Sequence, residues 1–189
     1  DSYAILPENC QVIGDTLMPL AMKVTAELYK LFWEETHMSQ TELVVNGGFE
    51  DGLTGWTPSN FYTDYLYPHT GNSDAFAGGD DNQTGYMRQV VTIPSEATSV
   101  TLTFWYNITS DEICKISGDD WLTVSIIDSA DRVTTVATHS DCGEQTLGIY
   151  NLESFELTPF RGQTITLRFD SKTDWMSPTT FRIDDVSIK

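Results

Sequence analysis

The residues of this chain that could do chemistry are mainly carboxylates, and several of them stand in adjacent pairs. Three such pairs are Asp80–Asp81, Asp119–Asp120 and Asp184–Asp185. A glycosidase needs two carboxylates across a cleft and a raised pKa on one of them. Adjacent aspartates more commonly accept hydrogen bonds in turns. These pairs therefore do not by themselves predict a hydrolase site.

The histidines and serines form no recognisable catalytic pattern either. His37, His69 and His139 are far apart and lack the spacing of a transition-metal site. No Gly-x-Ser-x-Gly elbow occurs, although a Ser-His-Asp set assembles in space and sequence order alone does not decide it. No glycine-rich loop stands ahead of a helix to hold phosphate. We therefore assign no catalytic residue and do not expect this chain to be an enzyme by itself.

Aromatic side chains are the other candidates for function, at 12% of the chain. Several fall in or beside segments expected to be loops, where they could stack on sugar rings or grip an extended peptide. Large loop aromatics also commonly cover the edge of a sheet, and the sequence leaves these interpretations open. The candidate ligand-binding residues are Tyr62, Tyr65, Tyr67, Trp121 and Trp175.

The charge of the chain excludes two classes of partner. The formal net charge is -18 at pH 7, from 28 acidic and 10 basic side chains. Such a surface repels nucleic acid and anionic membranes, so neither is expected as a partner. No apolar run approaches the ~18 residues of a membrane span, and residue 1 begins no signal-peptide pattern. The acidity fits a solvated surface, with the alternative that some carboxylates hold a hard cation.

The spacing of apolar residues changes near residue 40, from a helical pattern to short β-rich runs. Asp15 can cap a helix whose first turn accommodates Pro19. Apolar residues then recur at helical spacing and predict an amphipathic helix over 16–34, followed by a polar linker that ends at residue 40. The predicted domains are a helical segment with its linker over 1–40 and a second domain over 41–189. The apolar helix positions are Leu17, Leu20, Ala21, Val24, Leu28, Leu31 and Phe32.

Beyond residue 40 the helical spacing disappears and short β-rich runs alternate with turn signals. Many of these runs alternate apolar and polar residues, which predicts an antiparallel β-sandwich of jelly-roll type. The fold class is therefore mostly β, preceded by one amphipathic helix. The predicted strands are 41–45, 86–93, 99–108, 121–128, 133–139, 151–157, 164–169 and 180–188.

Two motifs frame this β-rich region. Residues 46–56 read NGGFEDGLTGW, and residues 181–188 read FRIDDVSI. With the segments 69–79, 87–94, 100–106 and 155–167 in the same order, they resemble the galactose-binding-like jelly rolls of carbohydrate-binding modules and of the C-termini of secreted bacterial peptidases. The resemblance implies a secreted, non-catalytic module. It identifies no ligand, because the shared residues are mostly strand and turn residues.

The resemblance also implies a structural calcium ion where the first and last strands lie side by side. Glu50 follows the opening strand, and Asp184 and Asp185 lie in the closing one. Carboxylates drawn together must be protonated, paired or metal-bound, and calcium takes about six to eight oxygens, many from loop carbonyls. Arg182 as a counter-charge, or simple solvation, is the alternative. The expected metal-binding residues are Glu50, Asp184, Asp185, Gly48, Asn72 and Ser73.

Residues 1–35 carry a second resemblance. Tyr3–Pro7, then Gln11–Ile13 and the helix, are similar to the C-terminal end of a zinc carboxypeptidase. The zinc ligands of that family, a His-x-x-Glu pair and a distant His, do not occur in this chain. The resemblance therefore implies an upstream catalytic domain, of which residues 1–40 would be the end.

These observations predict a non-catalytic accessory module of a secreted hydrolase, with a zinc metallocarboxypeptidase as the implied parent. Its role would be to stabilise the enzyme or to hold it on polymeric substrate, either polysaccharide or polypeptide. One alternative is a carbohydrate-binding module in the strict sense, with an aromatic surface that stacks on sugars. The other is a structural or adhesive extracellular domain.

The three cysteines predict one disulfide and one cysteine left over. The strands 121–128 and 133–139 should form a hairpin, so the loops before and after it emerge at the same end. Cys114 and Cys142 lie in these two loops, and a bridge between them would contribute about 3 kcal/mol. Two free thiols are the alternative. Cys10 lies outside the β-rich region, and its partner is not predicted.

Overall fold

The computed structural model describes residues 11, 13–37, 41–111, 120–144, 146 and 148–189. The chain divides into two compact units, Asp1–Gln40 and Thr41–Lys189. Each unit has its own kind of secondary structure, and each is described separately below.

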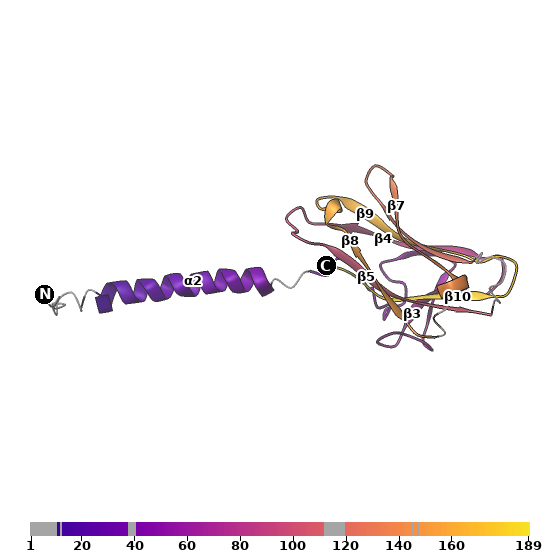
Figure 1. Cartoon of the computed structure of the whole chain (residues 1–189), viewed down its shortest axis with the longest axis horizontal. Coiled ribbons are helices and arrows are strands. Elements are labelled where there is room, and N and C mark those ends of the chain that lie inside the picture. The colour runs from indigo at the N-terminus through magenta and orange to yellow at the C-terminus, as the bar shows by residue number, and fades with distance from the viewer. Residues whose placement is uncertain (1–10, 12, 38–40, 112–119, 145, 147) are drawn as a thin grey trace. The chain divides into compact units, whose positions relative to one another are not determined.

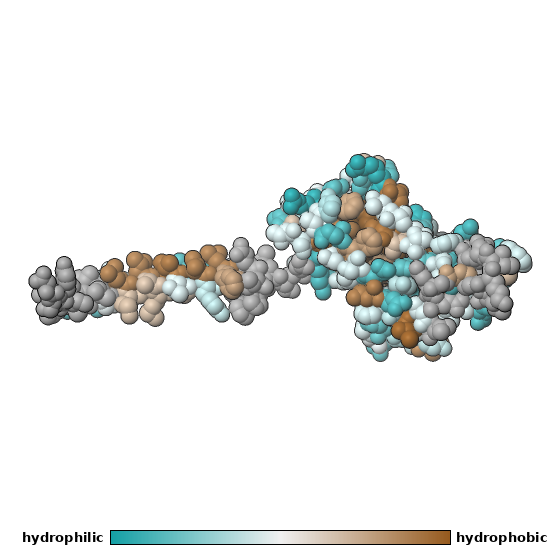
Figure 2. All heavy atoms as spheres, in the orientation of Figure 1, coloured by the Kyte–Doolittle hydropathy of each residue, from teal (hydrophilic) through white to brown (hydrophobic). Residues whose placement is uncertain are grey.

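The first unit is helical. A π-helical turn, η1, covers Ile13–Leu17, and the helix α2 covers Met18–His37, which corresponds to the helix predicted from the sequence. Its apolar side chains are exposed, and they form the brown stretch along α2 in Figure 2. Among the residues that the structure describes, no helix is both long enough and apolar enough to cross a membrane. The exposed apolar residues are Leu17, Met18, Leu20, Met22, Val24, Leu28, Tyr29, Leu31 and Phe32.

The second unit is an antiparallel β-sandwich, as predicted, and it consists of two five-stranded sheets. The first sheet has the order β1-β4-β9-β6-β7, and the second has the order β2-β3-β10-β5-β8. Figure 1 shows the two sheets as facing layers, with β4 and β9 in one and β5, β10 and β3 in the other. The strands of the first sheet are β1 (Thr57–Ser59), β4 (Thr84–Thr92), β9 (Thr164–Lys172), β6 (Trp121–Ile127) and β7 (Val133–Ser140). Those of the second sheet are β2 (Phe61–Asp64), β3 (Asp74–Gly78), β10 (Thr179–Ile188), β5 (Thr101–Ser110) and β8 (Asn151–Glu156).

Alternation along the strands places the core between the sheets. In β10, for example, Phe181 and Ile183 are fully buried while Arg182 between them faces outward. This follows from the two-residue period of a strand, which sends neighbouring side chains to opposite faces. An aromatic group at the centre joins the layers: the ring centroids of Phe104 and Phe169 are 5.3 Å apart, and those of Trp56 and Phe169 are 6.0 Å apart.

The opening segment of the sandwich runs beside β10, as the resemblance implied. The Leu43 N–H donates to the Ile188 carbonyl at 3.0 Å, and the Val186 N–H donates to the Gly47 carbonyl at 2.9 Å. A Cβ on Gly47 would lie 1.8 Å from the Val186 carbonyl oxygen, so only glycine allows this approach.

The predicted strand over 41–45 is nevertheless wrong. This segment is not a strand of either sheet. Leu43 pairs with the backbone of β10, but the backbone of Val45 pairs with a side chain. The Val45 N–H donates to Gln89 Oε1 at 2.7 Å, and Gln89 Nε2 donates to the Val45 carbonyl at 2.9 Å.

The sequence also gave no indication of β1, β2 and β3. These strands are short, and β3 consists largely of small residues (DAFAG), which have weak β-propensity. The predicted hairpin is present as β6 and β7, joined through Asp128–Arg132. Cys142 lies in the short helix α3 (Asp141–Glu144), but Cys114 lies outside the described residues. The Cys114–Cys142 disulfide therefore stays a prediction.

We predict that Thr41–Lys189 folds without the helical unit. The two units are separately compact, and the sandwich has a complete core of its own. Its thermal melt should be cooperative and should lie within about 4 °C of the melt of the full chain, because removal of α2 takes no core residue from the sandwich. A fragment that is soluble only with residues 1–40 attached would contradict this prediction.

Candidate functional site

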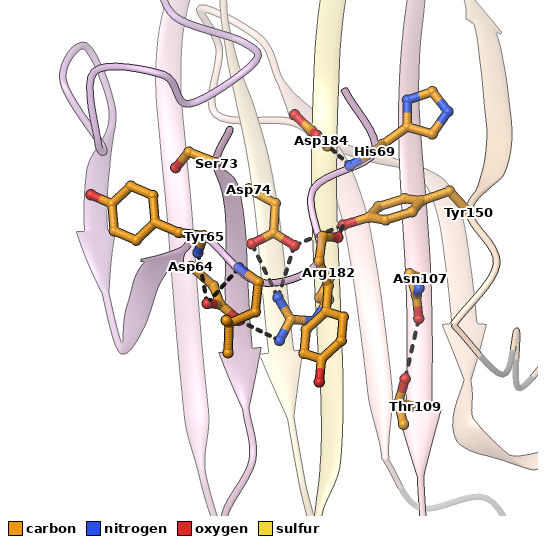
Figure 3. Close-up of polar contacts among 12 residues, drawn as sticks. Asp64, Tyr65, His69, Ser73, Asp74, Asn107, Thr109, Tyr150, Arg182 and Asp184 are labelled. Carbon is orange, nitrogen blue, oxygen red and sulfur yellow. Dashed lines mark hydrogen bonds and ion pairs between the residues drawn. The ribbon is translucent and has the colours of Figure 1, made fainter. Parts of the chain in front are cut away.

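A buried ion network lies at the centre of the outward face of the second sheet. Arg182 on β10 donates from Nη1 to Asp74 Oδ2 at 2.8 Å and from Nη2 to Asp64 Oδ2 at 2.6 Å. Its side chain is 11% exposed, and that of Asp74 is 0% exposed. The three residues come from β10, β3 and β2, which are neighbours in the sheet (Figure 3). Side chains from three strands are therefore tied together by one guanidinium.

Two aromatic rings pack against the same guanidinium. The Cζ atom of Arg182 lies 4.8 Å from the ring centroid of Tyr67 and 5.5 Å from that of Phe76. Cations are attracted to the negative face of an aromatic ring, most strongly where water is excluded. The guanidinium thus has carboxylates along its edge and aromatic rings against its faces.

The network also holds the loop that follows β2. Asp64 Oδ1 accepts the N–H of Tyr65 at 2.7 Å and the N–H of Leu66 at 3.1 Å (Figure 3). The Tyr150 hydroxyl lies 3.0 Å from the carbonyl oxygen of Tyr67. The side chains of this loop nevertheless face solvent, with Tyr65 70%, Leu66 74% and Tyr67 62% exposed. We call residues 65–67 the aromatic loop.

Burial and pairing set the protonation of the network. Burial raises the pKa of Asp74, against the hydrogen bonds from Arg182 and Tyr150, which lower it. Burial alone would also raise the pKa of Asp64, but Arg182 and the loop N–H groups hold this pKa below its usual value. Burial and the nearby Asp74 raise the pKa of the Tyr150 hydroxyl, so it stays protonated and can donate to Asp74 Oδ2, 2.7 Å away.

A histidine stacks on a tryptophan beside the network. The rings of His69 and Trp105 are 3.9 Å apart at an angle of 18°, so His69 covers one face of the indole. His69 Nδ1 lies 2.7 Å from Asp185 Oδ2, which fixes the imidazole. Trp105 belongs to β5, and its place on the outward face agrees with the alternation of that strand.

The carboxylate of Glu50 closes onto the turn before β3. Its Oε1 accepts the N–H of Asn72 at 2.7 Å and that of Ser73 at 3.1 Å. Gly71 has a φ of +64°, which favours glycine, and a Cβ there would displace the Glu50 carboxylate, whose Oε1 would lie 2.2 Å away. The hydrogen bond from the Asn72 N–H is the main influence that lowers the pKa of Glu50.

Asp184 and Asp185 hold the other side of the same turn. Asp184 Oδ2 accepts the N–H of His69 at 2.8 Å and that of Thr70 at 3.2 Å, and Asp185 accepts the Thr70 hydroxyl at 2.7 Å. A bulge in the pairing of β10 with β5 between Asp184 and Ser187 accompanies this arrangement. Burial, aided by the charge of Asp185, raises the pKa of Asp184 to about 6.

The predicted metal-binding residues therefore gather around the turn over 69–73. Gly48 lies beside them, since a Cβ there would be 3.6 Å from Asp185 Oδ1. Ser73 is 1% exposed, and its hydroxyl has no hydrogen-bond partner among the described residues. This oxygen-rich set suits a hard cation in kind. Within the described part of the chain, however, no three His, Cys, Asp or Glu side chains form a group that could hold a metal ion, so calcium stays a prediction.

The predicted counter-charge, Arg182, has a different role from the one expected. It pairs with Asp64 and Asp74, rather than with the carboxylates at the turn over 69–73. The sequence analysis missed both of these aspartates because it predicted neither β2 nor β3. The available signal was Arg182 itself, a charged residue between two core positions of a strand.

The predicted ligand-binding aromatics fall into two groups. Tyr62 lies on β2 and is 56% exposed. The aromatic loop with Tyr65 and Tyr67 directly follows this strand, so the three tyrosines belong to one region. Trp121 begins β6 of the other sheet, where it pairs with Lys172, and Trp175 lies in the loop between β9 and β10. That loop lies at the opposite end of β3, because the Thr173 hydroxyl donates to the carbonyl of Asp80. The structure does not bring the tryptophans to the tyrosines.

Comparison with known proteins places the fold. No protein-family model and no curated protein matches the chain. A solved family 61 carbohydrate-binding module in complex with β-1,4-galactotriose matches 79% of this chain and 99% of its own length, at 14% identity and a TM-score of 0.62. The second unit has the jelly-roll fold of carbohydrate-binding modules.

Two further structures share this jelly roll. A family 16 carbohydrate-binding module matches 78% of this chain and 99% of its own, at 15% identity and a TM-score of 0.53. The K3 cleaved adhesin domain of Lys-gingipain from Porphyromonas gingivalis matches 78% of this chain and 97% of its own, at 15% identity and a TM-score of 0.55. At these identities the likeness concerns the fold. It confirms the jelly-roll module predicted from the framing motifs.

We predict that Arg182→Met destabilises the chain by about 3–5 kcal/mol, because it leaves the fully buried Asp74 without its cationic partner. Asp74 loses the neighbour that lowers its pKa, so the folded variant binds more protons than the unfolded chain. The deficit in unfolding free energy relative to wild type should therefore shrink as the pH falls from about 7 to 5. Urea unfolding at several pH values measures both effects.

The matched control is Arg168→Met on the first sheet. Arg168 pairs with Asp170 at 2.6 Å and lies 4.7 Å from the ring centroid of Tyr86, but its side chain is 32% exposed. An exposed pair of this kind contributes at most about 1 kcal/mol. Equal losses in the two variants, or a loss at Arg182 that does not change with pH, would contradict the role assigned to Arg182.

Proposed function

We propose that the sandwich unit binds carbohydrate on the outward face of its second sheet, with the aromatic loop as the stacking surface. The observation that carries the proposal is that the tyrosine side chains of this loop are exposed while the loop backbone is hydrogen-bonded to the protein. Tyr65 and Tyr67 face solvent, while Asp64 accepts the N–H groups of Tyr65 and Leu66 and the Tyr150 hydroxyl lies beside the Tyr67 carbonyl. Ordering the backbone of this loop in advance reduces the entropy lost when a ligand binds.

The chemistry of tyrosine suits a sugar ring. One face of a pyranose presents C–H groups, which are attracted to the negative face of an aromatic ring. Tyr67 has Arg182 against one face of its ring and is 62% exposed, so its other face is available for stacking. The tyrosine hydroxyls supply hydrogen-bond partners for sugar hydroxyls.

Two of the structural neighbours support carbohydrate rather than polypeptide as the ligand. They are themselves carbohydrate-binding modules, and one of them was solved with β-1,4-galactotriose. Polypeptide remains the second ligand class to test, because exposed tyrosines also bind extended peptides.

The first test is the loss of polysaccharide binding in Tyr67→Ala. We expect this substitution to weaken binding by roughly tenfold, which corresponds to about 1.4 kcal/mol. Isothermal titration with soluble polysaccharides measures the change. Tyr86→Ala is the matched control, because Tyr86 also lies against an arginine but belongs to the first sheet. If Tyr67→Ala and Tyr86→Ala bind like wild type, the aromatic loop is not the site.

We also propose that a structural calcium ion ties the opening segment to β10. Glu50, Asp184 and Asp185 would have to draw closer together to hold it, because they form no three-carboxylate group in the described structure. Backbone carbonyls of Gly48, Asn72 and Ser73 would complete the ligands. The closeness of these carboxylates to one turn and the unpartnered hydroxyl of Ser73 support the proposal. The ion would supply positive charge where Asp185 repels Glu50 and Asp184.

Calcium that binds only the folded form should raise the melting temperature of the wild type. At a hundredfold excess over the dissociation constant, the gain is about 2.7 kcal/mol. The double variant Glu50→Gln, Asp185→Asn should lose this response. Differential scanning calorimetry in calcium and in chelator gives the comparison, and equal melting temperatures for wild type in both would refute the ion.

The parent protein is the last part of the proposal. We propose that the sandwich is an accessory module of a secreted hydrolase, and the resemblance of residues 1–35 favours a zinc metallocarboxypeptidase. The module would then keep its catalytic domain close to a polymeric substrate. A His-x-x-Glu motif followed by a distant His in the upstream sequence supports this parent, and a different catalytic signature there excludes it.

A further inference from the structure

The ion network of Arg182, Asp64 and Asp74 limits which polysaccharides can bind to the outward face of the second sheet. Resting on the proposed function, we infer that the face binds uncharged polysaccharides and rejects those that carry carboxylate groups. The argument has three parts: the engagement of Arg182, the sign of the surrounding charge, and the apolar character of the exposed surface.

A uronate is usually recognised by an arginine that offers two parallel N–H donors. Arg182 is the guanidinium of this face, but both of its terminal nitrogens already donate to aspartates. Tyr67 and Phe76 pack against the guanidinium, and only 11% of its side chain is exposed. A carboxylate of the ligand would have to displace a buried one, so the network offers no receptor for it.

The surrounding charge has the same consequence. Asp64 and Asp74 outnumber the single guanidinium of Arg182 on this face, while the charges of Asp184 and Asp185 would be offset by the proposed calcium ion. The imidazole nearest to them, that of His69, has its Nδ1 only 2.7 Å from Asp185, so a protonated ring would already be paired. The chain as a whole carries a formal charge of -18. A polyanion approaching this face is therefore repelled before it makes contact.

The exposed surface around the network is apolar and aromatic. Leu66 is 74% exposed beside Tyr67, and Leu152 on β8 is 52% exposed opposite Trp105. Such groups suit the C–H faces of uncharged sugars, whose binding requires no ion pair. Binding should therefore be nearly independent of salt, because there is little charge attraction to screen.

The experiment is affinity electrophoresis of the full chain in gels that contain one polysaccharide each. The uncharged probes are β-1,4-galactan, xylan and glucomannan, and the charged probes are polygalacturonate and alginate, each at about 0.02 M and about 0.2 M salt. We expect retardation by at least one uncharged polymer, equal at both salt concentrations and lost in Tyr67→Ala. We expect no retardation by the charged polymers at either concentration.

A second variant tests the role of the network directly. Asp64→Asn removes one charge and frees Arg182 Nη2, while the amide oxygen can still accept the loop N–H groups. It should be retarded by polygalacturonate at the lower salt concentration, where wild type is not retarded. An equal change in Asp170→Asn, which frees the exposed Arg168, would show that total charge rather than this face is responsible and would overturn the inference.

The outcomes separate the inference from the proposed function. Wild-type binding to polygalacturonate that depends on Tyr67 would overturn the inference and leave carbohydrate binding intact. Absence of binding to every polymer would overturn the proposed function and the inference with it. Salt-independent binding to an uncharged polymer alone, lost in Tyr67→Ala, supports both.

Discussion

The pairing of Arg182 with Asp64 and Asp74 is the interaction on which the outward face of the second sheet depends. It joins β10, β3 and β2 through one guanidinium whose own side chain is almost buried. Such a group is costly to bury alone and stable only when its partners are complete. Because Asp64 also binds the backbone of residues 65 and 66, the same pairing sets the position of the aromatic loop. The loop that carries the exposed tyrosines is thus hydrogen-bonded to Asp64, and Tyr67 packs on Arg182 of the same ion network.

A second constraint acts beside the first, where the opening segment meets β10. Gly47 lets the backbone approach Val186, and the turn over 69–73 is held between Glu50 on one side and Asp184 and Asp185 on the other. These contacts connect residues far apart in sequence and enclose the turn that leads into β3. Both constraints meet at β10, where Arg182 and Asp184 alternate with core residues. The charged residues of one strand thereby organise both the loop and the turn.

The sequence predicted an element correctly wherever apolar and polar residues alternate regularly along it. The long strands β4, β5, β6 and β10 follow from alternation, and the outward direction of Trp105 follows from its place in β5. The tyrosines were identified as candidates because they fall in or beside a segment expected to be a loop, and they are exposed. Asp64, Asp74 and Tyr150 were not predicted, because their meeting depends on short strands without a period and on side-chain pairing across the sheet. Gln89 shows the same limit, since a side-chain amide that pairs with the distant backbone of Val45 leaves no pattern in the sequence.

The central claim is that a sugar binds at the aromatic loop over the Arg182 network. It is tested most directly by NMR titration of the full chain with a soluble neutral oligosaccharide such as β-1,4-galactotriose, with the aromatic ring signals assigned. The account predicts that the ring signals of Tyr65 and Tyr67 shift with the ligand, while those of Trp121, Trp175 and Tyr86 stay unchanged. Shifts confined to Trp121 and Trp175, with the tyrosine signals unchanged, would place the ligand at the other end of the sandwich and contradict the account.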